Sequence, residues 1–426
     1  MRPVPDMLHS DPYPGTAAHS ACYPVWVQPA APNLSAAAAL DQPLQTPVPM
    51  LDLRRQYGPI HQELLDALEQ VLQTQQFILG EAVSGFERAA ASQLEVSNAL
   101  GCSSGTDALW LALAAAGIGP GDAVVTTPFS FFASVSAILR AGAVPVLADI
   151  DPATFNLSPL AVEAALNAPQ PTPIKAILPV HLYGQCADWT AFTRLGQARG
   201  LKLIEDAAQA WGAEWLGVKA GALGDIAAFS FYPTKNLSAA GEAGMVTTNS
   251  AELAERVRML RQHGMRSRYH HDEVGWNARM DGFQGAILAV KLKYIVGWNE
   301  DRRMVAERYY ALFRAAGLAE AGPYPTSGIV LPQEVPGSRR VWHQYVIRTK
   351  RRDDLREFLT ARKIGSEIYY PVPLHLQKAL QQLGNAEGSF AEAERASREV
   401  LALPIFPELR EDEQQTVADA IADFLS

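Results

Sequence analysis

One lysine in this sequence stands where its amine could do chemistry. Lys235 follows an apolar run, residues 226–231, that ends at Pro233, and its neighbours are small and uncharged. The nearest charged residues along the chain are Asp225 and Glu242. A lysine at the end of a strand can form a Schiff base with a carbonyl, and it can move protons if its site lowers its pKa. Taken alone, however, such a lysine is more often a solvated loop residue.

A second group of residues predicts an anion site. Ser104, Gly105 and Thr106 open a predicted helix in the segment CSSGTDALWLALAAAG, residues 102–117. Free N–H groups and the positive end of the helix dipole face whatever lies there. Gly105 lets an anion approach the backbone, and Thr106 adds a hydroxyl donor. The alternative is an ordinary Ser/Thr N-cap.

A carboxylate and an aromatic surface complete the set. Glu205 and Asp206 end an apolar run in LKLIEDAAQAWGA, where a buried carboxylate would be costly without a cationic partner. Gln209 can form hydrogen bonds in the same direction. In PFSFFASVSAI an aromatic residue could lie against a flat ring at the sheet edge. Taken alone, the first feature is more often a turn or cap, and the second is more often core packing.

Together these features match one cofactor. Pyridoxal phosphate requires a Schiff-base lysine and an acidic partner for its ring nitrogen, and here a phosphate cradle and a stacking surface accompany them. The carboxylate keeps the ring nitrogen protonated, so that the ring can draw electrons from the substrate carbanion. The sequence therefore predicts that Lys235 holds the cofactor and shuttles the proton.

The elements that must position these residues alternate along the chain. We expect strands within residues 122–128, 143–150, 174–182, 201–207, 225–231 and 244–249. Helices are expected within residues 60–74, 105–117, 131–142, 188–200 and 251–264. This alternation predicts an α/β domain with a largely parallel sheet, in which ligands bind at the carboxyl ends of the strands. A long helical pattern over 281–317 could bridge to a smaller C-terminal domain.

Composition excludes several classes of protein. The 426 residues are 48% hydrophobic and 19% charged, with a net charge of −9, which argues against nucleic acid as the main partner. The cysteines Cys22, Cys102 and Cys186 are widely spaced and fit a cytoplasmic setting. We expect no membrane span and no secretory signal. We also expect no metal site, because the pair His270 and His271 lacks a third ligand.

Six motifs in order resemble the pyridoxal-phosphate-dependent nucleotide-sugar aminotransferases of the DegT/DnrJ/EryC1/StrS family. They are SSGTDAL, PVHLYGQCADW, IEDAAQA, FSFYPTKNL, NARMDGFQGAIL and YYPVPLHLQ, and the resemblance runs from about Val48 to the C-terminus. It implies the α/β fold of fold type I transferases, with a large domain built on a mostly parallel mixed sheet between helices and a smaller α+β domain. We expect a flexible extension over residues 1–47, a large cofactor-binding domain over 48–300 and a small domain over 301–426.

The resemblance also implies roles for individual residues. Lys235 would carry the cofactor and Asp206 would pair with the pyridine nitrogen, so both would be catalytic. The other cofactor-binding residues would be Gln209 near the ring hydroxyl, Phe131 stacked on the ring, Gly105, Thr106 and Ser230 at the phosphate, and Asn277 reaching the phosphate of the neighbouring subunit. On the substrate side the residues would be His181, Arg279, Tyr369 and His375.

The implied reaction moves an amino group from L-glutamate to a nucleotide-linked keto sugar in a homodimer. Some family members replace the lysine with histidine and catalyse dehydration, so Lys235 favours transamination here. Arg266, Arg268 and Arg279 could meet the sugar diphosphate, or their loop could simply be solvated. The sequence leaves open the keto position (C3 or C4, with a preference for C3) and the carrier (dTDP, UDP or GDP). A different reaction of the same cofactor, such as a lyase or dehydratase, and a non-catalytic regulator are the alternatives.

Overall fold

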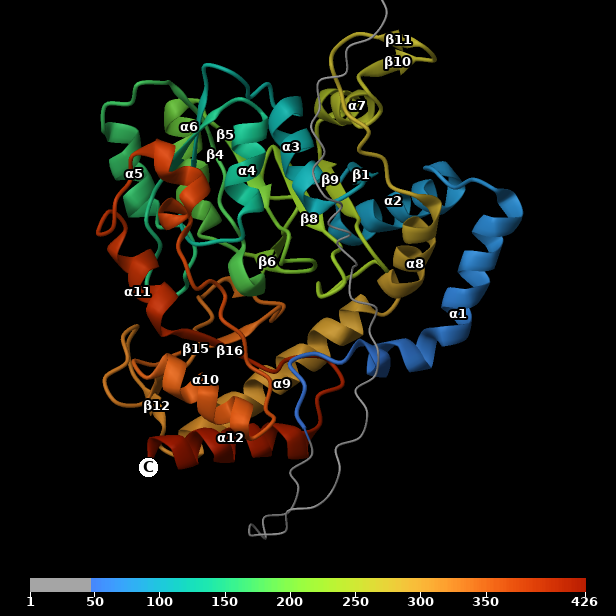
Figure 1. Cartoon of the computed structure of the whole chain (residues 1–426). Helices are drawn as coiled ribbons and strands as arrows, with labels where there is room; N and C mark the ends of the chain where they lie inside the picture. Colours follow the sequence, from blue (N-terminus) through green and yellow to red (C-terminus); the bar gives the residue numbers. More distant parts are fainter. Residues whose placement is uncertain (1–46) are drawn as a thin grey trace, which may run out of the picture. The chain divides into compact units, whose positions relative to one another are not determined.

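The computed structural model describes residues 47–426, so the expected flexible extension lies outside the described residues except for Pro47. Seven strands form one central sheet in the order β1-β9-β8-β5-β4-β2-β3. Figure 1 labels β1, β9, β8, β5 and β4 of this sheet. Their bounds are β1 Asn98–Cys102, β2 Ala123–Thr126, β3 Val144–Leu147, β4 Ile174–Ile177, β5 Lys202–Asp206, β8 Ile226–Ser230 and β9 Gly244–Thr248. Only β9 runs antiparallel to its neighbours, and the other pairs are parallel. The predicted mostly parallel α/β sheet is confirmed.

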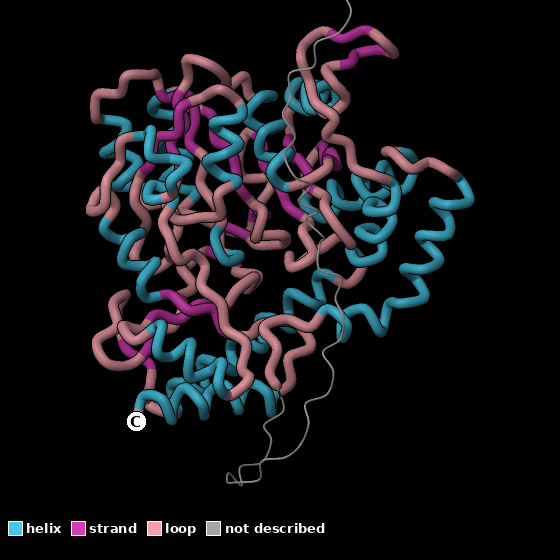
Figure 2. Tube along the Cα trace, viewed as in Figure 1, coloured by secondary structure: helices cyan, strands magenta, loops and turns pink. Residues whose placement is uncertain are grey.

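Helices cover both faces of this sheet, as the colouring in Figure 2 shows. The bounds are α2 Gly80–Leu94, α3 Gly105–Ala115, α4 Ala133–Arg140, α5 Pro159–Asn167, α6 Trp189–Arg199, α7 Ala251–Leu260 and α8 Gly282–Leu292. Successive side chains of a strand point to opposite faces. Ile204 and Ala228 pack with α3, α4 and α7, whereas Leu203 and Phe229 pack with the helices of the other face. Asp206 and Ser230 therefore project toward the α3 side.

Local signals explain where the helices begin. Ser104, Ser158, Asp188, Ser250 and Asp281 are the N-caps of α3, α5, α6, α7 and α8, and each side chain accepts a backbone N–H of the first turn. The helix α3 is buried almost all round, because it lies between the sheet and α4 and α7. Its start is thereby held against the ends of β8 and β9.

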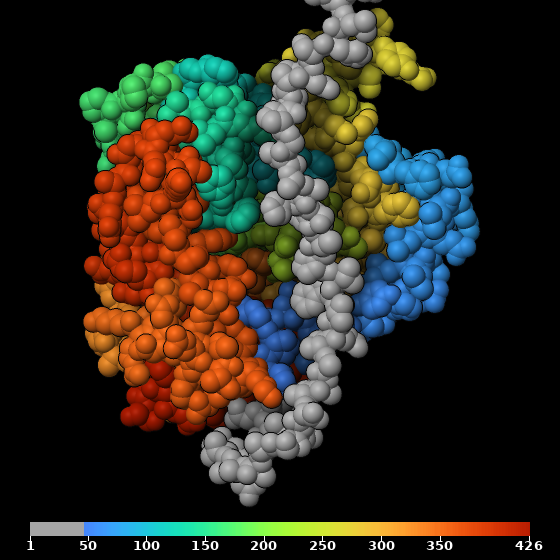
Figure 3. Space-filling view, in the orientation of Figure 1, coloured from blue at the N-terminus to red at the C-terminus, as the bar shows by residue number. Residues whose placement is uncertain are grey.

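A long helix, α1 Leu53–Thr74, follows the first described residues and lies along α8 at one edge of the molecule (Figure 3). Short strands accompany the main sheet: β6 Glu214–Trp215 and β7 Val218–Lys219 with β14 Ser338–Arg339, and the hairpin β10 Met265–Ser267 and β11 His270–His271. Three short 3-10 helices span Leu182–Gly184, Leu374–Leu376 and Lys378–Leu383.

The C-terminal part has its own sheet, and its core also includes residues that follow β2, β3 and β4, such as Phe129, Ile150 and Val180. Its helices are α9 Ile295–Ala315, α10 Arg352–Ala361, α11 Ala391–Glu399 and α12 Glu411–Leu425. Its strands, in the order β12-β13-β15-β16, are Ala319–Glu320, Ile329–Val330, Tyr345–Arg348 and Val400–Leu403. Val48 pairs with Ile364 and is buried in this core, so the first described residues pack with the C-terminal part.

Several elements differ from the expectation. The predicted continuous helix over 281–317 is wrong, because it breaks between α8 and α9, where the N–H groups of Lys293 and Tyr294 bond to carbonyls three residues back. No glycine or proline marks this break. The strand β1 was missed because its partner β9 lies about 150 residues away, which local patterns do not reveal.

The proposed boundary between residues 300 and 301 falls inside α9, and all described residues belong to one compact unit. We keep the division into a large and a small domain as a proposal. Within residues 47–426, no helix is both long and apolar enough to cross a membrane.

Candidate active site

Lys235 lies in the turn that follows β8, where its own N–H donates to the Tyr232 carbonyl at 2.8 Å. Lys235 as a whole is half-buried, with its amine in the protein interior. Burial lowers the pKa of Lys235 to about 8, against the opposing effect of the Asp206 charge. A minor fraction of this amine is therefore neutral near physiological pH.

Asp206 ends β5 and is 3% exposed. The Ser134 hydroxyl of α4 donates to Oδ2 at 2.7 Å, and the Ala208 N–H donates to Oδ1 at 3.2 Å. Burial raises the pKa of Asp206, and these two hydrogen bonds and the Lys235 charge partly offset the rise. Each of the two groups thus acts on the other's pKa, and the fold brings Lys235 and Asp206 together.

The N-terminus of α3 meets the ends of β8 and β9 with no room for a side chain. A Cβ placed on Gly105 would lie 2.5 Å from the Ser230 Cβ, and one on Gly244 would lie 2.2 Å from the Ser104 carbonyl oxygen. The N–H groups of Gly105 and Thr106 are in the first helical turn, where the helix offers no carbonyl partner. Gly105, Thr106 and Ser230 are brought together and form a cradle of donors.

Gln209 and two tyrosines form the wall beyond Asp206. The Gln209 Oε1 accepts the Tyr183 N–H at 2.7 Å, and its Nε2 donates to the Tyr370 hydroxyl at 3.1 Å. The ring of Phe131 is 60% exposed, and its centroid lies 6.5 Å from that of Tyr370. Phe131 therefore presents a free aromatic surface next to this wall. The adjacent Tyr369 is half-buried, and its carbonyl accepts the Tyr183 hydroxyl.

Two histidines that we assigned to the substrate side are enclosed. His181 is fully buried. Its Nδ1 accepts the Ala187 N–H, and its Nε2 lies 3.1 Å from Glu205 Oε2. His375 is 1% exposed, and its Nε2 lies 2.9 Å from Glu394 Oε1. In one chain, therefore, both imidazoles have their carboxylate partners inside the protein.

The remaining predicted residues lie on the segment around β10 and β11. Arg279 pairs with Cys102 at the end of β1 and donates to the exposed Asn277 Oδ1 at 2.8 and 3.1 Å. This places Arg279 near the start of α3. Arg266 and Arg268 lie on the exposed hairpin, which extends away from the sheet (Figure 1).

The structure adds residues that sequence reasoning missed. Ser134 binds Asp206, Tyr370 binds Gln209, and His343 contacts Asn236, which directly follows Lys235. Ser134 lies in the stretch where we expected an aromatic surface, and Asn236 adjoins the predicted lysine, so both were near a signal. His343 lies more than a hundred positions away, and no local pattern indicates it. Among residues 47–426, no cluster of His, Cys, Asp or Glu side chains could hold a metal ion.

Three related proteins match over nearly their whole length. A pleiotropic regulatory protein of Geobacillus stearothermophilus is 47% identical over 377 residues, covering 88% of this chain and 98% of the relative. The dTDP-3-amino-3,4,6-trideoxy-alpha-D-glucose transaminase of Streptomyces venezuelae is 42% identical, covering 89% and 97%. The UDP-N-acetyl-3-dehydro-alpha-D-glucosamine 3-aminotransferase of Acidithiobacillus ferrooxidans is 41% identical, covering 88% and 97%.

Two solved structures share the fold. DesV of S. venezuelae, in complex with a ketimine intermediate, matches with a TM-score of 0.84 and 42% identity, covering 90% of this chain and 99% of DesV. NtdA of Bacillus subtilis, with the cofactor PMP bound, matches with a TM-score of 0.80 and 32% identity, covering 89% and 85%. The family match itself spans residues 59–422. With the same fold and a match over most of its length, the chain belongs to the DegT/DnrJ/EryC1/StrS aminotransferase family.

Proposed function

We propose that this protein uses pyridoxal phosphate to move an amino group from L-glutamate to the C3 keto group of a nucleotide-linked sugar, in amino-sugar biosynthesis. The observation that carries this proposal is the shared buried position of the Lys235 amine and the Asp206 carboxylate, each of which shifts the other's pKa. A sugar transaminase needs this pair, and relatives with the named sugar activities support the substrate class.

The residues present fit the cofactor. The cradle of Gly105, Thr106 and Ser230 has no room for a side chain at Gly105. It is lined by N–H groups of the first helical turn and by hydroxyls, which are the donors that a phosphate requires. Asp206 receives only two hydrogen bonds from the part of the chain that the structure describes, and it keeps acceptor capacity for a protonated ring nitrogen. Gln209 and the exposed face of Phe131 would meet the ring hydroxyl and the ring plane.

When bound, pyridoxal phosphate supplies an aldehyde that condenses with amines and a ring that withdraws electrons. The protein's own groups do the rest. Asp206 would hold a proton on the ring nitrogen, because a buried carboxylate is stabilised by an adjacent cation. Lys235 would take and return the substrate proton at Nζ, since a pKa of about 8 leaves both protonation states available.

The nucleotide sugar would bind beyond this pair. Arginine recognises phosphate through two parallel N–H groups, so Arg279, with Arg266 and Arg268 on the hairpin, would meet the diphosphate. Tyr369, His181 and His375 remain proposed substrate-side residues, the two histidines with their Glu205 and Glu394 partners. The names of these two sugar aminotransferases place the amino transfer at C3 of the sugar, which supports the 3-keto position.

A second copy of this chain is the proposed partner. Leu65 and Leu72 of α1, with Phe77 and Ile78 after it, are between 41% and 56% exposed, which leaves an apolar edge. If Asn277 acts on the neighbouring site, mixing Lys235→Ala subunits with Asn277→Ala subunits should restore one complete site per mixed dimer. Failure of the mixture to regain activity, with mixed dimers shown by mass, would contradict this arrangement.

We also propose a cytoplasmic location, in line with the free thiols of Cys102 and Cys186.

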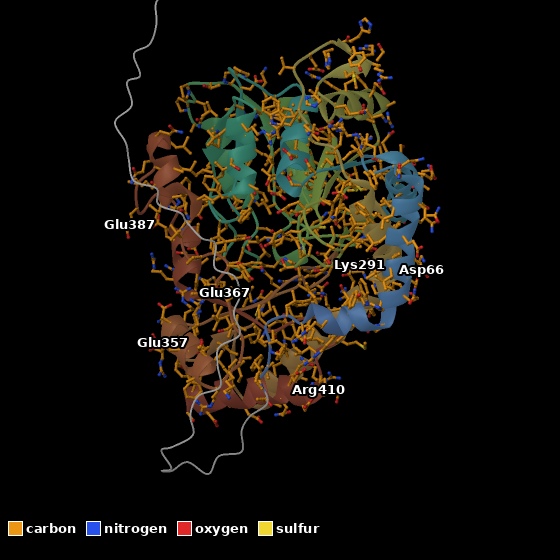
Figure 4. All side chains as sticks on the ribbon, turned by 45° about the vertical axis from the view of Figure 1, so that its right-hand side comes forward. Asp66, Lys291, Glu357, Glu367, Glu387 and Arg410 are labelled. Carbon is orange, nitrogen blue, oxygen red and sulfur yellow. The ribbon has the colours of Figure 1, made fainter. Side chains whose placement is uncertain are left out.

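Covalent trapping tests the proposal directly. Borohydride treatment of the yellow holoenzyme, followed by peptide mass spectrometry, should find a pyridoxyl group on Lys235. Lys291, labelled in Figure 4, is the matched control, because burial also lowers its pKa to about 8. Among the described residues, its amine bonds only the Ser238 hydroxyl, at 3.0 Å. Label on Lys291 alone, or an active Lys235→Ala variant, would refute the assignment.

A regulatory role is the second candidate, because a relative that is 47% identical is named a regulatory protein. A regulator needs to bind the cofactor or the sugar but does not need to turn over. Incubation of the holoenzyme with L-glutamate separates the two candidates. Release of 2-oxoglutarate with loss of the yellow colour supports the aminotransferase, whereas stable binding without keto-acid release supports the regulator.

A further inference from the structure

The loop after Lys235 is held by side chains from distant parts of the chain. Asn236 is 4% exposed, and its Nδ2 donates to Asn299 Oδ1 at 2.8 Å and to the Val341 carbonyl at 2.9 Å. Further along the loop, the Ser238 hydroxyl meets Lys291 and the Ala240 N–H donates to Gln284. The residue next to the lysine is therefore the most heavily anchored one.

This anchoring defines the protonation of His343. A backbone carbonyl only accepts, so the Val341 contact assigns Nδ2 of Asn236 as the donor and leaves Oδ1 as the acceptor. His343 Nδ1 lies 3.1 Å from that Oδ1 and must therefore carry the hydrogen. In the neutral ring, Nε2 then holds the lone pair. Burial first, and then the cations Lys235 and Arg302, keep the pKa of His343 well below its usual value, so the ring is neutral.

The backbone of His343 is fixed on both sides. Its N–H donates to the carbonyl of Tyr183 at 3.1 Å, and the N–H of the same Tyr183 donates to Gln209. Its carbonyl accepts from the buried Arg302 at 3.4 Å, and that guanidinium also bonds Trp342 and Ile405. The imidazole consequently has little freedom, and a rigid support of this kind can orient a neighbouring group.

We propose that His343 is a positioning residue for the Lys235 amine, acting through the hydrogen bond from its Nδ1–H to Asn236. This inference rests on the proposed function of Lys235. Because Asn236 and Lys235 are consecutive, the position of the Asn236 amide determines where the lysine side chain leaves the loop. His343 thereby links β15 of the C-terminal sheet, a strand that begins two residues later, to the reacting amine.

Two isosteric variants separate positioning from bulk packing. In His343→Asn the amide nitrogen can stand where Nδ1 stood, whereas in His343→Gln it stands near Nε2 and the Asn236 acceptor loses its donor. We expect His343→Asn to stay within about threefold of wild-type kcat and His343→Gln to lose about a hundredfold, as a misplaced reacting group does. KM for L-glutamate should change less than kcat in both variants, because the proposed role of His343 is to place the amine and not to bind the substrate.

A second readout does not depend on activity. Nitrogen-15 NMR of histidine-labelled wild-type protein, with His343→Asn for assignment, should show a protonated Nδ1 and an unprotonated Nε2. A protonated Nε2 with a bare Nδ1, or a His343→Gln variant with wild-type kcat, would overturn the inference. If wild-type protein takes no pyridoxyl label at Lys235, the proposed function fails instead, and the NMR result still decides the hydrogen bond to Asn236.

Discussion

Glu205 and Asp206 are consecutive on β5, but their side chains point to opposite faces of the sheet and meet different surroundings. Glu205 is fully buried and accepts four hydrogen bonds, from the N–H groups of Gly221, Leu223 and Gly224 and from His181. Within residues 47–426, Asp206 accepts only two hydrogen bonds, and it lies beside the charge of a lysine.

The difference separates a structural carboxylate from a chemical one. An ionised carboxylate has about four acceptor sites, so Glu205 is saturated while Asp206 keeps capacity for a ligand. The four donors to Glu205 tie loop 221–224 and the segment after β4 to the end of β5. That tie holds the strand end from which Asp206 projects. The role of each residue follows from its partners and not from its residue type.

The largest effect should come from Asp206→Asn. The amide cannot hold a proton on the ring nitrogen, so kcat/KM should fall on the order of a thousandfold, within the range for loss of a proton-handling group. Steady-state kinetics with L-glutamate and a keto sugar would measure this. A kcat/KM within tenfold of the wild-type value would contradict the catalytic role of Asp206. Circular dichroism should report an unchanged fold.

Glu205→Gln should damage stability instead. Its new NH2 group would face N–H donors in a buried network, which should lower the free energy of unfolding by about 3 kcal/mol. Urea unfolding of the apoprotein would measure the loss. Asp206→Asn is the control, and we expect no such loss. Since burial raises the pKa of Asp206, its charge costs folding free energy above pH 3.8, and a neutral residue removes that cost. Equal losses in both variants would erase the contrast.

The lysine beside Asp206 should show in the pH dependence of stability. Below about pH 8, Lys235 is protonated in both the folded and the unfolded chain. Between about pH 8 and pH 10.5, Lys235 is protonated only in the unfolded chain. The free energy of unfolding should therefore rise with pH across this window, by about 3 kcal/mol for this lysine. Lys235→Met should remove its share of the rise in the apoprotein. Lys291→Met should remove another share, because the pKa of Lys291 is lowered similarly.

Ser134→Ala should have the smallest effect. It removes one of the two hydrogen bonds to Asp206 and costs about 1 kcal/mol, or about fivefold in kcat/KM. The change should appear as a shift of cofactor absorbance with pH, because the pKa of Asp206 rises further without this donor. Ser136→Ala is a suitable control, since the Ser136 hydroxyl bonds only within its own helix, to the Ala133 carbonyl. Identical behaviour of the two variants would show that Ser134 does not support the site.

Local sequence patterns predicted the elements that carry Lys235, Asp206 and Gly105, because strand ends and helix starts are marked by short-range signals. Lys235 and Asp206 could be paired in advance since neighbouring parallel strands end at the same edge of the sheet. Ser134 and His343 could not be assigned in the same way. Their contacts with Asp206 and Asn236 join positions 72 and 107 residues apart.

The sequence by itself determined the α/β alternation, the lysine, the carboxylate and the small residues that open α3. Backbone propensities, capping and apolar periodicity act over a few residues, and a single chain displays them directly. Only the tertiary structure decided that Glu205 is saturated while Asp206 is left open, and that His343 supports the loop of the lysine. Burial and hydrogen-bond partners depend on which distant segments pack together, and they determine whether a charged side chain holds the fold or remains free to react.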